Sequence, residues 1–437
     1  MMVLAVMVSL YAVYIVTGLV LGYPLRGQLN SIGTLTTWIA LFAMFSLALN
    51  LQWGYTGLFN IGIIGFAGVG IYTMAIVSNS FSAPSSGQVG GFGLPWVVGI
   101  VAGVAVATAF GFIVALPALR LRADYLAIVT IAFSEIMRFA FLSGDFEVIT
   151  LGKYGILPAQ NIGLGGGSGI IYDFPSPMDA LVGGLGLSSF YGGLVHWFGN
   201  DLPGLFGAAA IENPKPIVDQ LVYGFLLLAG VYGFYWLLKR TGESPFGRVL
   251  KAIREDEDVA RALGKDTDRF KIQAFMIGCG LMGLVGILWL WGQGTVTPTN
   301  IRPRMTFFIW IALILGGSGS NTGSILGGAV FAGTLFQGPL YLKNVLNQVL
   351  PIQNAPATFG QAGGEVINGL DPVPMIAYIF ANIRQLQLVI MGIVLILVMI
   401  YRPQGMLGHR TETAASISLD RPRLRRSAGN DGGESDE

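Results

Sequence analysis

Few residues of this chain have the types and spacing that catalytic or metal chemistry requires. His196 and His409 are the only histidines, and Cys279 is the only cysteine. Neither histidine has cysteine, histidine or carboxylate neighbours at the spacing of a metal site, and a lone cysteine excludes an intramolecular disulfide. No acid and base pair emerges either. The sequence therefore predicts neither an enzyme nor a metal site.

The glycine-rich runs lack the chemistry of a nucleotide site. GGSG at 316–319 and GLGGGSG at 163–169 have no lysine in the GxxxxGK[ST] pattern, whose backbone N–H groups and ammonium cradle phosphates. We interpret 316–319 as a tight break between two apolar spans. After it, Gly323, Gly327 and Gly328 are expected to let helix backbones approach closely.

Polar side chains inside the apolar spans form a second group of candidates. Such groups are costly in lipid, so they tend to face a cavity or a partner. The candidates for lining a path through the membrane are Asn50, Asn60, Thr130 and Glu135, with Ser134, Gln273 and Gln337 as further polar positions.

Three of these candidates have competing interpretations. Asn50 and Asn60 flank the sequence GYTG at 54–57, where a broken helix could expose backbone carbonyls to a cavity. The two amides could equally cap helix ends. Glu135 either belongs to the path or ties a moving helix, or it pairs with Arg138 at i+3 on the same helix face.

The elements that must position these residues are membrane helices. Of 437 residues, 53% are hydrophobic and only 11% charged, against about a quarter in soluble domains. A helix of about 20 residues crosses a hydrocarbon core of about 30 Å. The apolar runs near that length are 3–21, 32–51, 57–78, 95–118, 125–142, 217–238, 271–292, 305–318, 323–342 and 385–401.

These runs predict an all-α polytopic membrane protein with about ten transmembrane helices in a transmembrane domain at 1–402. The runs at 57–78 and 305–318 are compatible with broken or re-entrant helices, because the first is rich in glycine and the second is short. The first run has no basic n-region and no small-residue cleavage site, so we expect a membrane span there rather than a secretory signal.

The distribution of basic residues predicts the orientation. Lysine and arginine collect in cytoplasmic loops, and the segment 239–271 holds nine of them. The connection after the fourth run and the tail at 403–437 are basic as well, and we expect the polar tail to be disordered. The stretches 143–216 and 343–384 are poor in basic residues and are expected outside. Ten crossings with both termini in the cytoplasm satisfy all of these assignments.

The charged loop at 239–270 is predicted to form two short helices. Ser244 and Pro245 are typical of a helix start, and apolar residues then recur at i, i+3, i+4 and i+7. The acidic residues 255–258 suit the positive end of a second helix, which is expected to stop before Gly264. A solvated connector whose charges only fix the topology is the alternative.

Four blocks of the sequence resemble the permease subunits of prokaryotic ABC importers for branched-chain amino acids. The first is the charged loop, GESPFGRVLKAIREDEDVARALGKDTDRFKIQAF at 242–275. The other three lie at 47–76 (LALNLQWGYTGLFNIGIIGFAGVGIYTMAI), 116–139 (LPALRLRADYLAIVTIAFSEIMRF) and 313–331 (LILGGSGSNTGSILGGAVF). Together they follow the family's order and cover most of the membrane region.

This resemblance implies a multi-pass subunit of the prokaryotic plasma membrane that works with other chains. Separate ATPase subunits would bind ATP and Mg²⁺, an external solute-binding protein would deliver the solute, and a second homologous permease subunit or a second copy of this chain would complete the path. No cofactor in this chain and no nucleic acid is implied. The partner surface for the ATPase would run from 245 to 264. In that surface Phe246, Ile253, Val259 and Leu263 would enter a groove on the ATPase, Arg254, Glu255 and Asp256 would set the register, and Gly264 would end the second helix.

Leucine, isoleucine and valine are the solutes that the resemblance implies, and related permeases carry urea or short amides. A secondary transporter driven by an ion gradient would also be polytopic, but it would not need the two-helix loop. A passive channel would need a repeated filter motif, and NAPA at 354–357 occurs once. The external stretch at about 157–215 is longer than the family pattern, which suits a docking surface, a lineage-specific addition or a lid.

Overall fold

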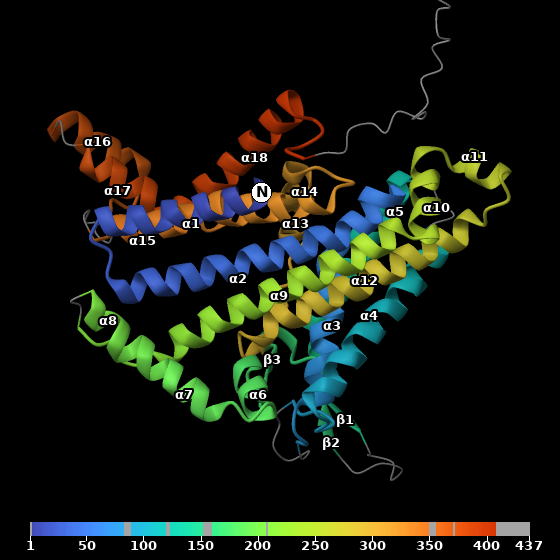
Figure 1. Cartoon of the computed structure of the whole chain (residues 1–437), viewed down its shortest axis with the longest axis horizontal. Coiled ribbons are helices and arrows are strands. Elements are labelled where there is room, and N and C mark those ends of the chain that lie inside the picture. Colours follow the sequence, from blue (N-terminus) through green and yellow to red (C-terminus); the bar gives the residue numbers. More distant parts are fainter. Residues whose placement is uncertain are drawn as a thin grey trace, which may run out of the picture.

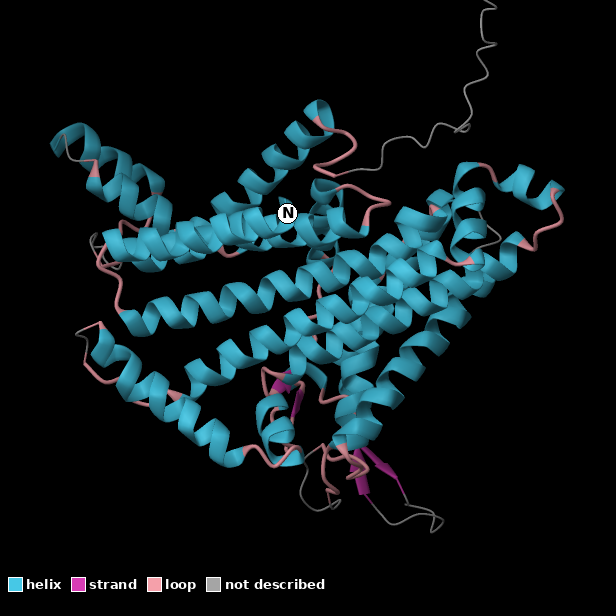
Figure 2. Ribbon diagram, in the orientation of Figure 1, coloured by secondary structure: helices cyan, strands magenta, loops and turns pink. Residues whose placement is uncertain are grey.

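The fold is almost entirely helical, as the apolar runs predict (Figures 1 and 2). The computed structural model describes residues 2–82, 89–118, 123–151, 160–206, 209–348, 355–369 and 372–407. Within these ranges, seven helices are long and apolar enough to cross a membrane, and three shorter apolar helices accompany them. These helices coincide with the ten apolar runs, so the polytopic all-α fold class is confirmed.

The apolar helices follow the chain in the predicted order. They are α1 (Met2–Val20), α2 (Leu25–Leu49), α3 (Ile63–Ser78), α4 (Trp96–Ala118), α5 (Ala123–Leu142), α9 (Lys215–Glu243), α12 (Thr267–Trp291), α13 (Arg304–Gly316), α14 (Asn321–Val330) with its continuations η6 (Phe331–Phe336) and α15 (Gly338–Leu346), and α18 (Ile383–Tyr401).

The core lies around α2, α3 and α12. In the most apolar stretch of each span, 78% of the residues of α2 with its continuation to Gly54 and 72% of those of α12 are buried, against 17% of those of α18. Glycines allow the close contact: a Cβ on Gly70 of α3 would lie 2.5 Å from the carbonyl oxygen of Gly283, and one on Gly286 would lie 2.3 Å from that of Ala67. Helices α3 and α12 therefore pack backbone against backbone.

One predicted span begins with a break, and another is short. Helix α2 continues into a π-helical turn, η1 (Asn50–Gly54), and the chain is not helical from 57 to 62, before α3 begins. Helix α13 is only 13 residues long, and the residue after it, Gly317, has a φ of 103°, a conformation that glycine adopts readily. The expectation of broken or short helices in these two runs is confirmed.

The turn between α13 and α14 is the tight break expected at 316–319. Gly319 also has a positive φ, of 87°. Beyond it, a Cβ on Gly327 would lie 2.1 Å from the carbonyl oxygen of Ala312, and one on Gly328 would lie 2.6 Å from the backbone nitrogen of Ala43. Helix α14 therefore packs tightly on α13 and α2, as its glycines predict.

Short elements fold the long loop before α9 onto the ends of the spans. Strands β1 (Ile149–Leu151) and β2 (Gln160–Ile162) pair antiparallel, and β3 (Ile170–Ile171) pairs with β4 (Thr295–Val296) just after α12. The remaining short elements here are η3 (Gly144–Phe146), η4 (Gly166–Ser168), α6 (Pro177–Gly184), α7 (Ser188–His196), η5 (Trp197–Asp201) and α8 (Leu202–Leu205).

The charged loop lies at the other end of α9 and α12 from these elements (Figure 1). It forms α10 (Pro245–Glu255) and α11 (Glu257–Ala262), whereas α16 (Phe359–Gly369) and α17 (Val373–Ala381) precede α18. After α18, the N–H groups of Met406 and Leu407 donate to the carbonyls of Leu315 and Gly316 at 2.9 Å, which joins this end of the chain to the α13–α14 turn.

Some expectations fall outside the described residues. These are the basic connection with Arg120 and Arg122, the external Lys153, Asn354 of the NAPA motif, and the tail from 408 onward.

Candidate functional site

The loop between α9 and α12 folds as two helices because its ends are capped locally. At the start of α10, the Ser244 hydroxyl accepts the N–H of Gly247 at 3.2 Å. Asp256 ends α10 and starts α11, where its carboxylate accepts the N–H of Val259 at 3.0 Å. Gly264 follows α11 with a φ of 78°. The two helices and their predicted ends are confirmed.

An ionic cluster fastens α11 to the first turns of α12. The Glu257 carboxylate lies 2.7 Å from the Lys271 ammonium and 3.0 Å from the Arg261 guanidinium, and it accepts the Thr267 hydroxyl at 3.1 Å. Burial alone raises the pKa of Glu257, but the hydrogen bond and charge of Lys271, with Thr267 and Arg261, outweigh burial and hold its pKa below the ordinary value. The carboxylate therefore stays ionised and holds α11 in place.

The residues expected to meet an ATPase divide between two faces of the loop. Ile253 is 5% exposed, and the Phe246 ring stacks on Phe270 with centroids 5.5 Å apart, so both pack against this chain. Val259 and Leu263 are 54% and 74% exposed. The same side of the loop also exposes Arg254, Glu255, Asp256 and Gly264.

Arg254 connects the loop to the break after α2. Its guanidinium donates a hydrogen bond to the carbonyl of Gly54, the last residue of η1. A Cβ on Gly54 would lie 2.7 Å from the backbone nitrogen of Gly319, so η1 and the α13–α14 turn are in direct contact at this point. Three segments that are distant in sequence therefore meet at one junction.

Asn50 completes this junction from inside the protein. The Asn50 side chain is fully buried. Its carbonyl oxygen accepts the N–H of Gly319 at 2.7 Å, and its amide donates to the Asn321 side chain at 3.0 Å. Asn50 thus holds the start of α14 against η1, and its side chain joins the two elements.

Gln52 and Asn60 bridge the two sides of the non-helical segment. The Gln52 amide donates to the Phe275 carbonyl of α12 at 2.9 Å, and its oxygen accepts the Asn60 amide at 2.8 Å. The Asn60 oxygen accepts the N–H of Gly62 at 2.7 Å. Both side chains are fully buried. Because the non-helical backbone lies within protein and the N–H groups of Gly57, Leu58, Asn60 and Gly62 are bonded within the chain, it is tolerated at membrane depth.

Neighbouring helices also bond this segment and the first turn of α3. The Thr130 hydroxyl of α5 accepts the N–H of Ile61 at 3.0 Å, and the Thr306 hydroxyl of α13 accepts that of Ile64 at 3.3 Å. Trp310 donates its indole N–H to the Asn60 carbonyl at 3.0 Å. The segment is therefore bonded to α5, α12 and α13 at once.

Aromatic rings cover the same segment. The Trp310 ring lies with its centroid 4.6 Å from Phe59 and 5.4 Å from Trp53, and the Trp53 and Phe59 rings are 5.3 Å apart. Ring pairs at these separations attract each other. Three mutually packed rings therefore close the chain around the break in this state.

Glu135 lies apart from this network. Its carboxylate pairs with Arg138 of the same helix at 2.6 Å, and its side chain is 32% exposed. The local i+3 ion pair is the interpretation that the structure supports. Ser134, the residue before it, is buried, and its hydroxyl has no hydrogen-bond partner among the described residues. Gln273 and Gln337 are partly exposed.

Three residues of the network were not among the sequence candidates. Gln52 is an amide two positions from Asn50 in the same span, so the cost of burying polar groups in lipid was a signal that could have found it. Thr306 and Trp310 are bonded to backbone groups more than 240 positions away in sequence. No local pattern marks such contacts. Throughout the described part of the chain, no three His, Cys, Asp or Glu side chains gather as metal ligands do.

Known proteins similar to this chain are permeases. Residues 31–399 match the model of the family described as branched-chain amino acid transport system / permease component. The chain is 32% identical to the high-affinity branched-chain amino acid transport system permease protein LivM of Salmonella typhimurium over 302 residues and of Escherichia coli over 303 residues. It is also 28% identical over 159 residues to the permease protein LivH of Salmonella typhimurium, covering 35% of this chain and 51% of that relative. No solved structure matches the chain significantly.

The matches cover most of this chain but only part of each LivM relative. The two LivM alignments cover 69% of this chain and 61% of each relative, so the chain spans about three fifths of their length. The family model covers most of the chain, including η1, the non-helical segment and the two-helix loop. This chain belongs to the family of permease components of branched-chain amino acid transport systems.

Proposed function

We propose that this chain is the membrane-spanning permease subunit of an ABC importer and forms part of the path for branched-chain amino acids, while separate subunits hydrolyse ATP. Beside the family, one observation carries the proposal: Arg254 bonds the exposed two-helix loop to the break after α2. A partner changes a two-state equilibrium only through different affinities for the two states. An ATPase that binds the loop more tightly in one state would act directly on the break.

The proposed ATPase surface is the exposed side of α10 and α11. Val259 and Leu263 form its apolar part, and Glu255 and Asp256 give it negative charge. Phe246 and Ile253 support α10 from the inner side and keep it fixed to the membrane region. An apolar pair ringed by charge suits a groove on a partner protein.

Replacing Leu263 with aspartate tests this surface. A charge in an apolar groove is costly, so we expect at least tenfold weaker co-purification of the ATPase. Leu205 on α8 is also 74% exposed and lies at the other end of the molecule, so Leu205→Asp is the matched control and should retain the ATPase. Equal retention by both variants would contradict the proposed surface.

We propose that the loop and the residues after α18 face the cytoplasm, with 143–216 and 343–384 outside. Residues 406–407 contact the α13–α14 turn, and Gly319 of that turn lies beside Arg254 of the loop. These contacts support placing both segments on the same side of the membrane. A membrane-impermeant maleimide should label Ser188→Cys in intact cells and Lys265→Cys only after lysis. The native Cys279 is fully buried and gives no background.

A second homologous permease subunit and an external solute-binding protein complete the proposed importer. The similarity of this chain to both LivM and LivH, two permease proteins of one organism, supports a pair of related subunits. Helices α4 and α5 are 28% buried in their most apolar stretches, which leaves faces for lipid or for that second subunit.

Uptake by reconstituted vesicles decides between the transporter classes. Proteoliposomes that contain this chain with its ATPase, second permease and solute-binding protein should accumulate labelled leucine only when ATP is available to the ATPase. Excess isoleucine or valine should compete, whereas urea should not. Uptake driven by a proton gradient without the ATPase would establish a secondary transporter instead.

A further inference from the structure

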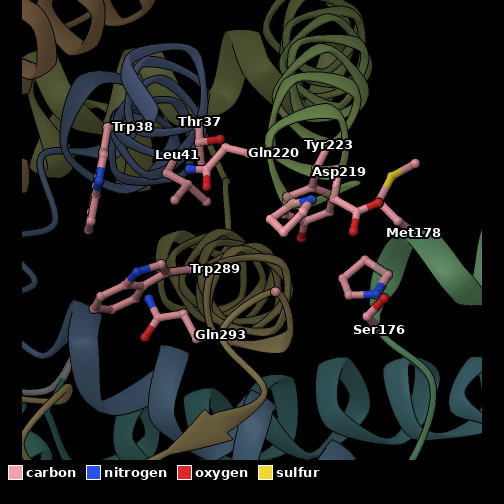
Figure 3. Close-up of a pocket in the computed structure, with 13 residues that line it drawn as sticks. Thr37, Trp38, Leu41, Ser176, Met178, Asp219, Gln220, Tyr223, Trp289 and Gln293 are labelled. Carbon is pink, nitrogen blue, oxygen red and sulfur yellow. The ribbon is translucent and has the colours of Figure 1, made fainter. Parts of the chain in front are cut away.

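A cavity of about 380 Å³ lies between α2, α9, α12 and α6 (Figure 3). Its walls include Thr37 and Trp38 from α2, Asp219 from α9, and Trp289 from α12. The α9 residues belong to the end of that helix that begins at Lys215, whereas its other end leads into α10. With the proposed orientation, the cavity opens toward the outside.

The cavity runs from an exposed rim to a buried floor. Ser176 and Gln293 at the rim are exposed, whereas Leu41 and Trp289 at the floor are 2% and 7% exposed. A volume of about 380 Å³ is that of roughly a dozen water molecules, within the range of small-molecule sites. A solute that enters at the rim can therefore reach apolar side chains in the outer half of the helices.

Asp219 supplies a negative charge to this cavity. Its carboxylate accepts a hydrogen bond from the Tyr191 hydroxyl of α7. The nearby Lys215 is bound to Asp179 at 3.0 Å, and across the described ranges no basic side chain lies within 4.0 Å of Asp219. Lys215 acts on Asp219 only through a longer-range charge interaction, so no cation contacts this half-buried carboxylate among the described residues. The missing cation can be a solute ammonium group.

Two hydrogen-bond donors on the opposite wall also lack partners. The indole N–H of Trp289 and the hydroxyl of Thr37 are buried, and neither has a hydrogen-bond partner among the described residues. The residues Trp289 and Thr37 line the cavity, and a turn of either side chain would bring its donor to the cavity surface. An unbonded buried donor is costly, so a ligand acceptor at this wall would be stabilising. Figure 3 shows these side chains on α2 and α12, across the cavity from Asp219 on α9.

We propose that this cavity binds the amino-acid solute in transit, with its ammonium group at Asp219 and its carboxylate at Trp289 and Thr37. The aliphatic side chain would lie against Leu41 and Met178, which are both buried. This inference rests on the proposed function and specifies a zwitterionic aliphatic ligand. The site offers no fixed cation to the carboxylate among its lining residues, which suits binding weak enough for the solute to leave again.

Binding of leucine and two analogues to the importer in nanodiscs, without the solute-binding protein, tests the assignment. Saturation-transfer difference NMR detects such weak binding. Isoamylamine keeps the ammonium group and lacks the carboxylate, whereas isocaproate keeps only the carboxylate. We expect leucine and isoamylamine to bind and isocaproate to bind at least tenfold more weakly, because Asp219 repels it.

Variants separate the two ends of the ligand. Asp219→Asn should weaken leucine and isoamylamine at least tenfold. Trp289→Phe and Thr37→Val should weaken leucine and leave isoamylamine unchanged, because only leucine has a carboxylate to accept their hydrogen bonds. Asp201→Asn is the matched control: it removes an exposed carboxylate of η5 that pairs with His196 and does not line the cavity, so this variant should bind as the wild type does.

The result that overturns the site is leucine binding to Asp219→Asn as tightly as to the wild type, or isocaproate binding as well as isoamylamine. If Asp219→Asn does not assemble, Asp219→Glu, which keeps the charge, and the analogue series on the wild type still decide. Failure of the wild-type importer to take up any aliphatic amino acid in proteoliposomes would refute the proposed function itself. If the wild-type importer takes up leucine and Asp219→Asn binds leucine as tightly as the wild type, only this site is refuted.

Discussion

Replacing Arg254 with alanine should uncouple ATP hydrolysis from uptake without releasing the ATPase. The Arg254 guanidinium is bonded to the Gly54 carbonyl, so its removal separates α10 from η1 while the exposed Val259 and Leu263 remain. The proposed importer would then hydrolyse ATP while the loop moves independently of the break.

The size of the effect follows from the bond that is lost. A hydrogen bond from a charged donor contributes about 1.5–3 kcal/mol. The Arg254 side chain is exposed, so solvent screens the interaction and the lower end of that range applies. A loss of about 1.5 kcal/mol corresponds to roughly a tenfold change in an equilibrium constant. We therefore expect about tenfold more ATP hydrolysed for each leucine imported.

The assay measures ATP hydrolysis and leucine uptake in the same proteoliposomes, together with ATPase co-purification. Arg248→Ala is the matched control, because Arg248 is an exposed arginine of the same helix. If Arg254 instead sets the register of the ATPase, its variant will lose the ATPase on purification. An unchanged ratio of ATP to leucine, equal to that of Arg248→Ala, would refute the coupling argument.

Two further predictions concern stability. The pKa of Glu257 lies below its ordinary value of 4.5 in the folded loop, so the stabilisation it gives is complete well above that pH and is lost as pH falls through the folded value. The protection factors of the α11 amides, which correct for the slower intrinsic exchange in acid, should therefore fall as pH falls, and Glu257→Gln, which weakens the tie to Lys271, should remove that pH dependence. Gly286→Ala places a Cβ 2.3 Å from the Ala67 carbonyl and should destabilise the protein by about 1–3 kcal/mol, whereas Gly233→Ala meets nothing within 4 Å; thermal loss of the monodisperse fraction measures both.

Local signals made the two-helix loop predictable from the sequence. Ser244, Pro245 and Gly264 act through their own backbone neighbourhoods, so their types specify the helix ends without any knowledge of tertiary structure. The apolar spacing of α10 likewise predicts an inner face. It does not identify which molecule covers that face, and Ile253 turns out to be covered by this chain.

Contacts between distant segments were not predictable. Arg254 and Gly54 are 200 positions apart, and Asn60 and Trp310 are 250 apart. Asn50 and Asn60 could be recognised as unusual because amides are costly in a span, but their partners depend on how α12, α13 and α14 pack. Hydropathy therefore located the break, and only the packing shows what it is bonded to.

The bonds of the break indicate where the chain can move. Opening the segment 57–62 on its own would break the buried hydrogen bonds of Gln52 and Asn60, at about 1–3 kcal/mol for each group left unbonded. The contact of Arg254 with Gly54 lies at the boundary with solvent, where water can replace a lost partner. Movement of the break as one body with α12 and α13 therefore costs less free energy than unwinding of its backbone. Because the loop is attached at the edge of that body, a small displacement of α10 can turn the whole body without breaking its internal bonds.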